Sequence, residues 1–255
     1  MLRGERTVWV RVAHGLESLS GLGARVWNEP AAVRNALREL LSVLPLTHVQ
    51  LDLAALRRRS DPAAGWKAVL GRGDGWAELL RETTQATSDA VRGRAEWGIG
   101  LPGPAEAAAS LGDASERGVL KAGLQLASFL QGLREADLAF VAVDLSGASV
   151  PDKVVAPVFR NAEMYGWRRA AVVGGIAEGA GAAEIRLVGD APFGELCEAW
   201  RRGELVGGGL GAAFWSGAAP PAPVPPRALL FGEMPAGIEP AAIVAAGRSL
   251  HQWLS

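Results

Sequence analysis

Eight short strand-like segments recur along the chain, and helical patterns separate most of them. They are centred near residues 8, 49, 98, 141, 171, 186, 209 and 229. Alternation of strands and helices is typical of a parallel sheet that is covered by helices. Eight such units in about 250 residues match a closed (β/α)8 barrel of the TIM type. The sequence therefore predicts an α/β fold, with a single barrel domain over residues 1–255.

The segments differ in how clearly they indicate strands. Phe140–Leu145 is continuously apolar, as expected for a strand that is covered on both faces, whereas four glycines make Leu205–Phe214 ambiguous. A Pro-rich stretch at 218–226 predicts a stiff connector before the last strand. An open doubly wound sheet is the alternative, but the first strand runs into His14-Gly15-Leu16-Glu17 without the glycine-rich turn of that fold.

Helix boundaries can be predicted from capping residues. Asn28 is a plausible N-cap for the helical pattern that ends at Pro45, and Asp152 for the one that follows it over 153–165. The spacing also predicts a long helix over 116–135 and helical segments at 66–70 and 76–92.

Composition excludes several classes of protein. The chain has 26 basic and 27 acidic side chains and a net charge of −1, which argues against a nucleic-acid partner held by bulk positive charge. No apolar run reaches the roughly 18 residues of a membrane span, so we expect no membrane partner. The first residues read as a strand rather than a signal peptide, and the one cysteine, Cys197, allows no intrachain disulfide. A cytoplasmic location is therefore expected.

In a barrel of this kind, functional side chains gather where the strands end. Acids, an arginine and a histidine occupy the predicted strand ends: Arg11, His14, Asp52, Asp144, Asp190 and Glu233. Converging carboxylates suit acid–base work because they push one another's pKa values apart. We predict Asp144, His14 and Glu233 as catalytic residues, and Arg11, Arg25, Asp52 and Asp190 as substrate-binding residues.

Other interpretations remain open for these residues. Each acid could instead cap a helix or form a surface pair, His14 could be structural, and Cys197 is expected to be packed. Glycine clusters at 174–181 and 207–211 suit either phosphate binding or flexible loops. The arginines at 57–59 and 168–169 are predicted to face solvent. No metal site is predicted.

Several short motifs resemble one superfamily. Trp97–Pro104 is similar to the Pro-Gly-Pro turn of cobalamin-independent methionine synthases, and Asp144 matches the acid that ends a later strand there. Leu229–Pro235 and Ile238–Pro240 resemble the last strand and loop of the uroporphyrinogen decarboxylase and methionine synthase superfamily, and Asn161–Gly166 fits the same pattern. The resemblance implies a barrel enzyme that performs one-carbon (methyl) transfer or decarboxylation of a small anionic organic molecule.

The resemblance also assigns roles to residues. Asp144 would bind or polarise the substrate, His14 would move a proton, and Arg11 or Arg25 would hold a carboxylate. The methionine synthases bind zinc through His, Cys and Glu ligands; since Cys197 has no accompanying histidine here, zinc is not expected and no other cofactor is indicated. The only tyrosine, Tyr165, lies in a predicted helix rather than in a decarboxylase site.

A non-enzymatic alternative follows from the absence of a complete catalytic motif. The chain could be a barrel that has lost its chemistry and serves as a binding or assembly subunit. Nine tryptophans supply candidate anchors, of which Trp27, Trp215 and Trp253 are predicted in loops or near the terminus. Either reading is compatible with a homodimer or a partner protein.

Overall fold

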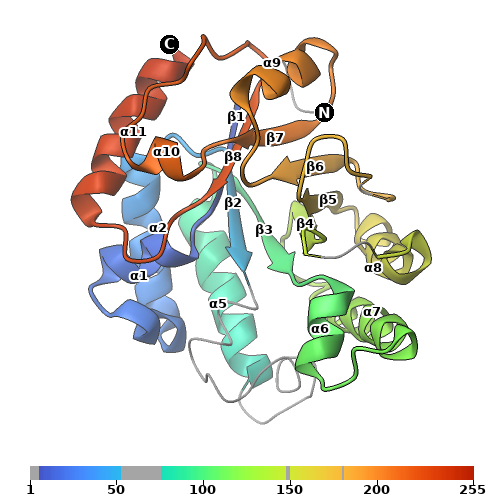
Figure 1. Cartoon of the computed structure of the whole chain (residues 1–255). Coiled ribbons are helices and arrows are strands. Elements are labelled where there is room, and N and C mark those ends of the chain that lie inside the picture. Colours follow the sequence, from blue (N-terminus) through green and yellow to red (C-terminus); the bar gives the residue numbers. More distant parts are fainter. Residues whose placement is uncertain (1–5, 53–75, 148–149, 180) are drawn as a thin grey trace.

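The computed structural model describes residues 6–52, 76–147, 150–179 and 181–255. Eight parallel strands form a closed barrel in sequence order, and β8 pairs with β1 (Figure 1). The strands are β1 (Thr7–Arg11), β2 (His48–Asp52), β3 (Glu96–Leu101), β4 (Phe140–Asp144), β5 (Arg168–Val173), β6 (Ile185–Val188), β7 (Val206–Gly209) and β8 (Leu229–Glu233). The predicted (β/α)8 barrel is confirmed.

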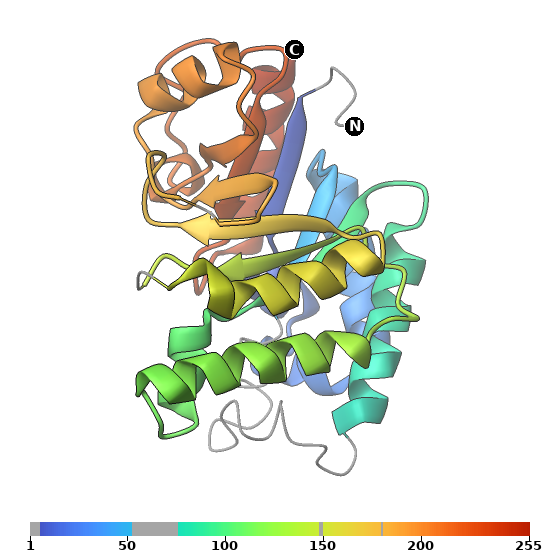
Figure 2. The same cartoon turned by 90° about the vertical axis from the view of Figure 1, so that its right-hand side faces the viewer.

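Helices surround this barrel (Figure 1). They are α1 (Ala13–Ser20), the 3-10 helix η1 (Gly23–Asn28), α2 (Pro30–Val43), α5 (Trp76–Val91), α6 (Pro104–Ser110), α7 (Glu116–Gln131), α8 (Asp152–Met164), α9 (Phe193–Arg201), α10 (Ala212–Trp215) and α11 (Pro240–Leu254). The long helices α7 and α8 lie side by side along one flank of the barrel (green and yellow in Figure 2). Between β5 and β6, the described residues 174–179 and 181–184 contain no helix.

Alternation along the strands separates two hydrophobic cores. Val8, Val10 and Val12 point outwards, where they join the large cluster that packs the helices against the sheet. Trp9 points inwards, because successive side chains of a strand face opposite sides. The side chains inside the barrel form a second cluster with Trp9: Phe140, Ala142, Ala170, Val172, Ile185, Leu187, Leu229 and Phe231. The interior of the barrel is therefore filled by side chains, so a functional site has room only at its ends.

Inward-facing glycines make room for the large rings of this inner core. The Trp9 ring centroid lies 3.9 Å from that of Phe140 and 6.4 Å from that of Phe231. A Cβ on Gly98 of β3 would overlap the ring and carbonyl oxygen of Phe140, and one on Gly207 of β7 would overlap Leu229. The glycines that make the seventh strand ambiguous in the sequence thus leave the space that large side chains of the neighbouring strands occupy. Segment 205–214 resolves into β7 followed by the short helix α10.

Two of the predicted helix caps are wrong. The N-cap of α2 is Glu29, not Asn28, and the N-cap of α8 is Pro151, with Asp152 as its first helical residue. Neither cap forms a side-chain hydrogen bond. Proline at the first helical position starts α2, where its fixed φ suits the helix and its missing N–H costs nothing.

Segment 218–226 connects α10 to β8 without regular secondary structure, and Val224 within it is buried. The predicted helix at 66–70 and the arginines at 57–59 lie outside the described residues. In the part of the chain that the structure describes, no helix is both long and apolar enough to cross a bilayer.

Candidate active site

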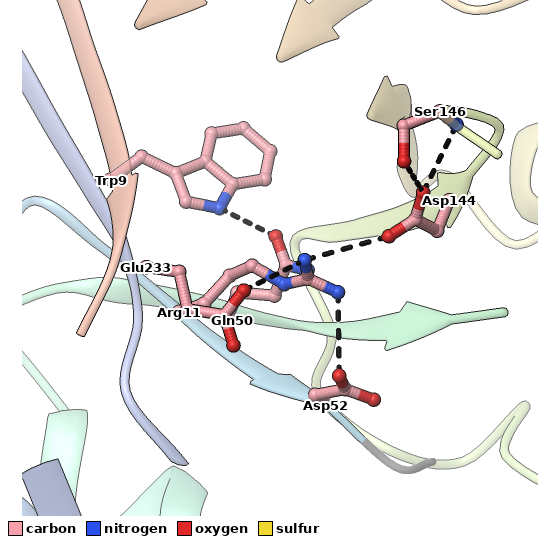
Figure 3. A network of polar contacts seen from close by, with 7 residues as sticks. All are labelled: Trp9, Arg11, Gln50, Asp52, Asp144, Ser146 and Glu233. Atoms are coloured by element: carbon pink, nitrogen blue, oxygen red, sulfur yellow. Dashed lines mark hydrogen bonds and ion pairs between the residues drawn. The ribbon is translucent and has the colours of Figure 1, made fainter. Parts of the chain in front are cut away.

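Arg11 lies at the centre of the barrel mouth, where the strands end. Its guanidinium is 3.3 Å from Asp52 Oδ2, 3.5 Å from Asp144 Oδ2 and 3.2 Å from Glu233 Oε2 (Figure 3). Each of the four is the last residue of its strand and occupies an inward-facing position. Arg11 ends β1, Asp52 ends β2, Asp144 ends β4 and Glu233 ends β8. We call these four residues the Arg11 cluster. Four of the seven predicted site residues therefore lie together at one rim.

The cluster carries one positive and three negative charges, and thus a net charge of −2. Burial of Arg11 disfavours its charged form, but the charges of Asp52, Glu233 and Asp144 outweigh this effect and raise the pKa of Arg11 above its usual value. Arg11 is therefore permanently protonated. It is also largely covered, with 12% of its side chain exposed, so its charge is weakly screened by solvent.

The carboxylates differ in how firmly they are held. Asp144 Oδ1 accepts hydrogen bonds from the backbone N–H of Ser146 at 3.1 Å and from the Ser146 hydroxyl at 2.6 Å, while its Oδ2 faces Arg11. This turn fixes Asp144 as an acceptor. Glu233 is 47% exposed and uses Oε2 towards Arg11. Glu233 is thus the carboxylate of the cluster with the most open access to a molecule in the mouth.

Gln50 is a fifth polar residue beneath the cluster that the sequence analysis did not select. It is fully buried in β2, and it pairs in register with Arg11 of β1. Its Oε1 accepts a hydrogen bond from Trp9 Nε1 at 3.0 Å (Figure 3), whereas its Nε2 and the Nε of Arg11 have no partner among the residues that the structure describes. The alternation of β2 in the sequence indicates this position. Val49 and Leu51 point outwards, so the polar residues that alternate with them lie inside the barrel.

The structure describes other surroundings for the remaining predicted site residues. His14, in the first turn of α1, has its Nδ1 3.5 Å from Oε2 of Glu17, which also accepts from Trp27. Arg25 is exposed on η1. Asp190 is exposed after β6 and lines a separate cavity of about 190 Å³ with Phe193. Nothing in the described part of the chain links Arg25 or Asp190 to the Arg11 cluster.

A cavity of about 340 Å³ adjoins the cluster through Ser146. It lies between the loop after β4 and the loop after β5, and its described lining includes the acids Asp152 and Glu178. One oxygen of Glu178 accepts from the backbone N–H of Gly174 at 2.9 Å, so the glycine-rich loop after β5 folds around a carboxylate. Negative charge thus extends from the mouth into this cavity.

The opposite end of the barrel holds a second polar group, which corrects one prediction. Arg168 and Arg169 do not face solvent: only 23% and 20% of their side chains are exposed. Arg168 pairs with Glu96 and lies with Nη2 2.7 Å from Nε2 of His48. Nε2 of His48 also lies 3.1 Å from Oε2 of Glu96, so one ring nitrogen faces both a cation and a carboxylate. Burial, and then the charge of Arg168, lower the pKa of His48 to about 3.

The tryptophans offered as docking anchors are mostly buried. Trp27 is 1% exposed and Trp215 is 7% exposed, and Trp253 is partly buried against the rings of Phe193 and Phe214. Trp27 and Trp215 lie in η1 and α10 rather than in loops, Trp253 lies near the end of α11, and all three pack against the outer core instead of standing out as anchors. Cys197 is buried on α9, and burial raises its pKa. Among the described residues, no group of three or more His, Cys, Asp or Glu side chains is arranged to hold a metal ion.

No protein-family model matches the chain, and a search of curated proteins gives no match. Among solved structures, an amidohydrolase from Burkholderia ambifaria with bound zinc is 11% identical, with a TM-score of 0.48 over 81% of this chain and 65% of that one. A protein described as an L-alanine-DL-glutamate epimerase from Burkholderia xenovorans strain LB400 is 14% identical, with a TM-score of 0.49 over 80% of this chain and 51% of that one. The chain thus spans about two thirds and about half of their lengths. Neither likeness bears on its activity.

The resemblance to the uroporphyrinogen decarboxylase and methionine synthase superfamily is wrong. No family model supports it, and the solved structures that the chain is similar to include an amidohydrolase and an epimerase. The motifs have local explanations. Pro104 starts α6 at its first position, and Gly232 of β8 is required because a Cβ there would overlap the backbone of Leu210. The expected one-carbon transfer and decarboxylation lose their basis with it.

Proposed function

We propose that this chain is a small-molecule enzyme whose active site is the Arg11 cluster at the barrel mouth. The observation that carries the proposal is the contact of one largely buried guanidinium with carboxylates from three other strands. Concentrated charge is costly to bury, and hydrophobic residues would stabilise a barrel at least as well. The group lies at the strand ends, which is the position of catalytic residues in TIM-type barrels. A catalytic role therefore explains it better than a contribution to stability.

Within this proposal, Glu233 is the general acid–base residue. It is the most exposed carboxylate of the cluster, and a candidate base needs access to the proton it removes. Asp144 and Asp52 orient Arg11, and Asp144 is itself held by Ser146. Arg11 contributes a fixed positive charge that holds Glu233 in place beside it. His14 and Asp190 are not needed for this assignment.

The charges favour an uncharged polar or a cationic substrate. The cluster has a net charge of −2, and the adjoining cavity adds the carboxylates of Asp152 and Glu178. Arg11 is already shared among three acids, so little of its charge is left for an anion. An anionic substrate held by Arg11 or Arg25 stays a prediction, and this geometry gives it no support.

A turnover screen with two matched variants tests the proposal. Wild-type protein would be assayed against panels of small amines, polyols and carbonyl compounds, with Glu233→Gln and Glu198→Gln alongside it. Both variants remove one exposed carboxylate, but Glu198 lies on the outer helix α9. We expect an activity that is lost in Glu233→Gln and retained in Glu198→Gln. An activity that survives in Glu233→Gln would refute the assignment.

The alternative of a binding or assembly subunit has lost one of the two observations that motivated it, since Trp27 and Trp215 are buried. The large apolar side chains exposed on the described surface are dispersed over α7, α8 and the turn before β7: Leu120, Leu124, Met164 and Leu205. A homodimer or partner protein stays a prediction.

A further inference from the structure

We infer that Gln50 is a specificity residue, which together with Nε of Arg11 binds an uncharged oxygen acceptor of the substrate, either a carbonyl or a hydroxyl. The inference rests on the proposed function, because it names the substrate class for the same site. It starts from two buried N–H donors, Gln50 Nε2 and Arg11 Nε, that have no acceptor in the structure.

The orientation of the Gln50 amide is fixed by its neighbour. Indole nitrogen can only donate a hydrogen bond, so the Gln50 atom 3.0 Å from Trp9 Nε1 must be the carbonyl oxygen. The NH2 group therefore points away from Trp9. Trp9 is itself fully buried and packed against Phe140, so it holds the amide rigidly.

The NH2 group reaches the level of the Arg11 cluster. A Cβ on Gly100 would lie 2.6 Å from Gln50 Nε2, and Gly100 pairs in register with Asp52 at the end of β2. Glycine at position 100 is thus required for this amide position. Because Gln50 also pairs in register with Arg11, the two unsatisfied donors belong to neighbouring side chains on the same face of adjacent strands.

Unsatisfied buried donors of this kind are rare, because each loses its hydrogen bonds to water without replacement. A substrate oxygen that accepts from both donors removes this penalty, whereas a ligand without such an oxygen leaves it in place. A buried polar group therefore discriminates strongly between the two kinds of ligand. The surrounding net charge of −2 opposes an oxygen that carries negative charge. The acceptor that fits is therefore an uncharged carbonyl or hydroxyl oxygen.

Three probes of nearly identical shape test this inference: acetamide, acetate and acetamidinium. Each would be titrated into 13C- and 15N-labelled full-length protein while the side-chain NH2 of Gln50, the Nε–H of Arg11 and the carboxylate carbons of Asp144 and Glu233 are followed by NMR. The Gln50 signals would be assigned by their loss in Gln50→Met. We expect acetamide to move both signals along one binding curve, and acetate to bind at least about tenfold more weakly because of like-charge repulsion.

Two variants provide controls. Gln50→Met keeps the length of the side chain without its donors, and we expect it to weaken acetamide binding about fivefold. It also leaves Trp9 Nε1 without an acceptor, so Trp9→Phe/Gln50→Met, which removes both partners, serves if the single variant folds poorly. An unchanged affinity for acetamide in a folded variant overturns the inference.

The outcomes separate this inference from the proposed function. Acetamidinium has no acceptor oxygen and should move the carboxylate signals of the cluster but not the Gln50 amide. If probes move signals of Asp144 and Glu233 while the Gln50 amide stays still, the inference fails and the proposed site stands. If acetate binds as well as acetamide, the uncharged acceptor is wrong. If no probe moves any signal of the cluster, the proposed site and the inference both fail.

Discussion

Arg11 and Glu233 are paired in register across β1 and β8, and their side chains meet with Nη1 3.2 Å from Oε2. These two strands close the barrel, so this ion pair joins residues from near both ends of the chain. The cluster therefore exists only when the barrel is closed, because neither half of the chain holds Arg11 together with all three acids. Stability and the proposed chemistry are coupled through this one contact.

Replacing Arg11 by methionine should destabilise the fold. Three carboxylates would be left close together without their cation, and removing one partner of a buried ionic group costs about 3 kcal/mol. Urea denaturation at pH 7 measures this change. Arg11→Lys keeps the charge and should lose less, although a lysine cannot bridge three acids in the same geometry.

The loss in Arg11→Met should also depend on pH. Without the cation, the three carboxylates repel one another in the folded state, and protonation relieves this repulsion in the folded state but not in the unfolded chain. The free energy of unfolding of this variant should therefore recover relative to wild type as the pH falls from 7 towards 4.5. A difference between the two proteins that is constant over this range would contradict the account.

Asp144→Asn should keep the turn but lose the ion pair. The asparagine carbonyl can still accept from Ser146, while its NH2 would face the donors of Arg11. We expect a loss of about 1–2 kcal/mol in the free energy of unfolding, together with at least a tenfold fall in any turnover found. Ser146→Ala removes only the hydroxyl contact and should cost less. Full activity in Asp144→Asn would exclude a role for its charge.

Much of this site could be predicted because strand ends in a parallel barrel share one rim. Arg11, Asp52, Asp144 and Glu233 each follow directly from where a strand ends, without knowledge of any distance. The position of Arg25 could not be predicted in this way, because it lies on η1 and depends on a loop conformation that the periodicity of the sequence does not encode. Similarly, Asp190 lies at a strand end but turns into another cavity.

The sequence also indicates which side of the sheet a strand residue faces, and this information identifies the residue that was missed. In a barrel the apolar face of a strand meets the helices, so a strand with alternating character keeps its polar residues inside. Applied to β2, this rule finds Gln50, and it also places His48 inside the barrel at the opposite end. The rule does not place Arg168, because β5 begins with two arginines, one on each face. Asn28 failed as a cap for another reason: Pro30 determines where α2 starts.

His48 should make the protein sensitive to acid. Its pKa is about 3 in the folded state because of burial and then the charge of Arg168, against about 6.5 in the unfolded chain. Below about pH 6.5 the unfolded state takes up a proton that the native state does not, so stability falls as the pH is lowered towards 3, by about 1.4 kcal/mol per pH unit. Glu96, which pairs with Arg168, has its Oε2 3.1 Å from Nε2 of His48, and its charge offsets part of this loss once the ring is protonated.

Urea denaturation between pH 7 and pH 5 measures this contribution by comparison with His48→Gln. The variant lacks the titrating ring, so the difference in slope between the two proteins isolates His48 from the acids of the barrel. His251→Gln is the matched control, because His251 is exposed on α11. Equal slopes for wild type and His48→Gln would show that His48 titrates normally in the folded state.

Gly98→Ala should destabilise the barrel from inside, whereas Gly194→Ala should not. A Cβ at Gly98 would overlap Phe140, which is fully buried beside Trp9 and has no space into which to move. Overpacking of this kind costs about 1–3 kcal/mol. A Cβ at Gly194, in the helix α9, would meet nothing within 4 Å, so the alanine there should stabilise the helix by about 0.5–1 kcal/mol. Chemical denaturation of both variants measures the opposite signs, and a neutral Gly98→Ala would mean that the inner core is less tightly filled than its ring contacts indicate.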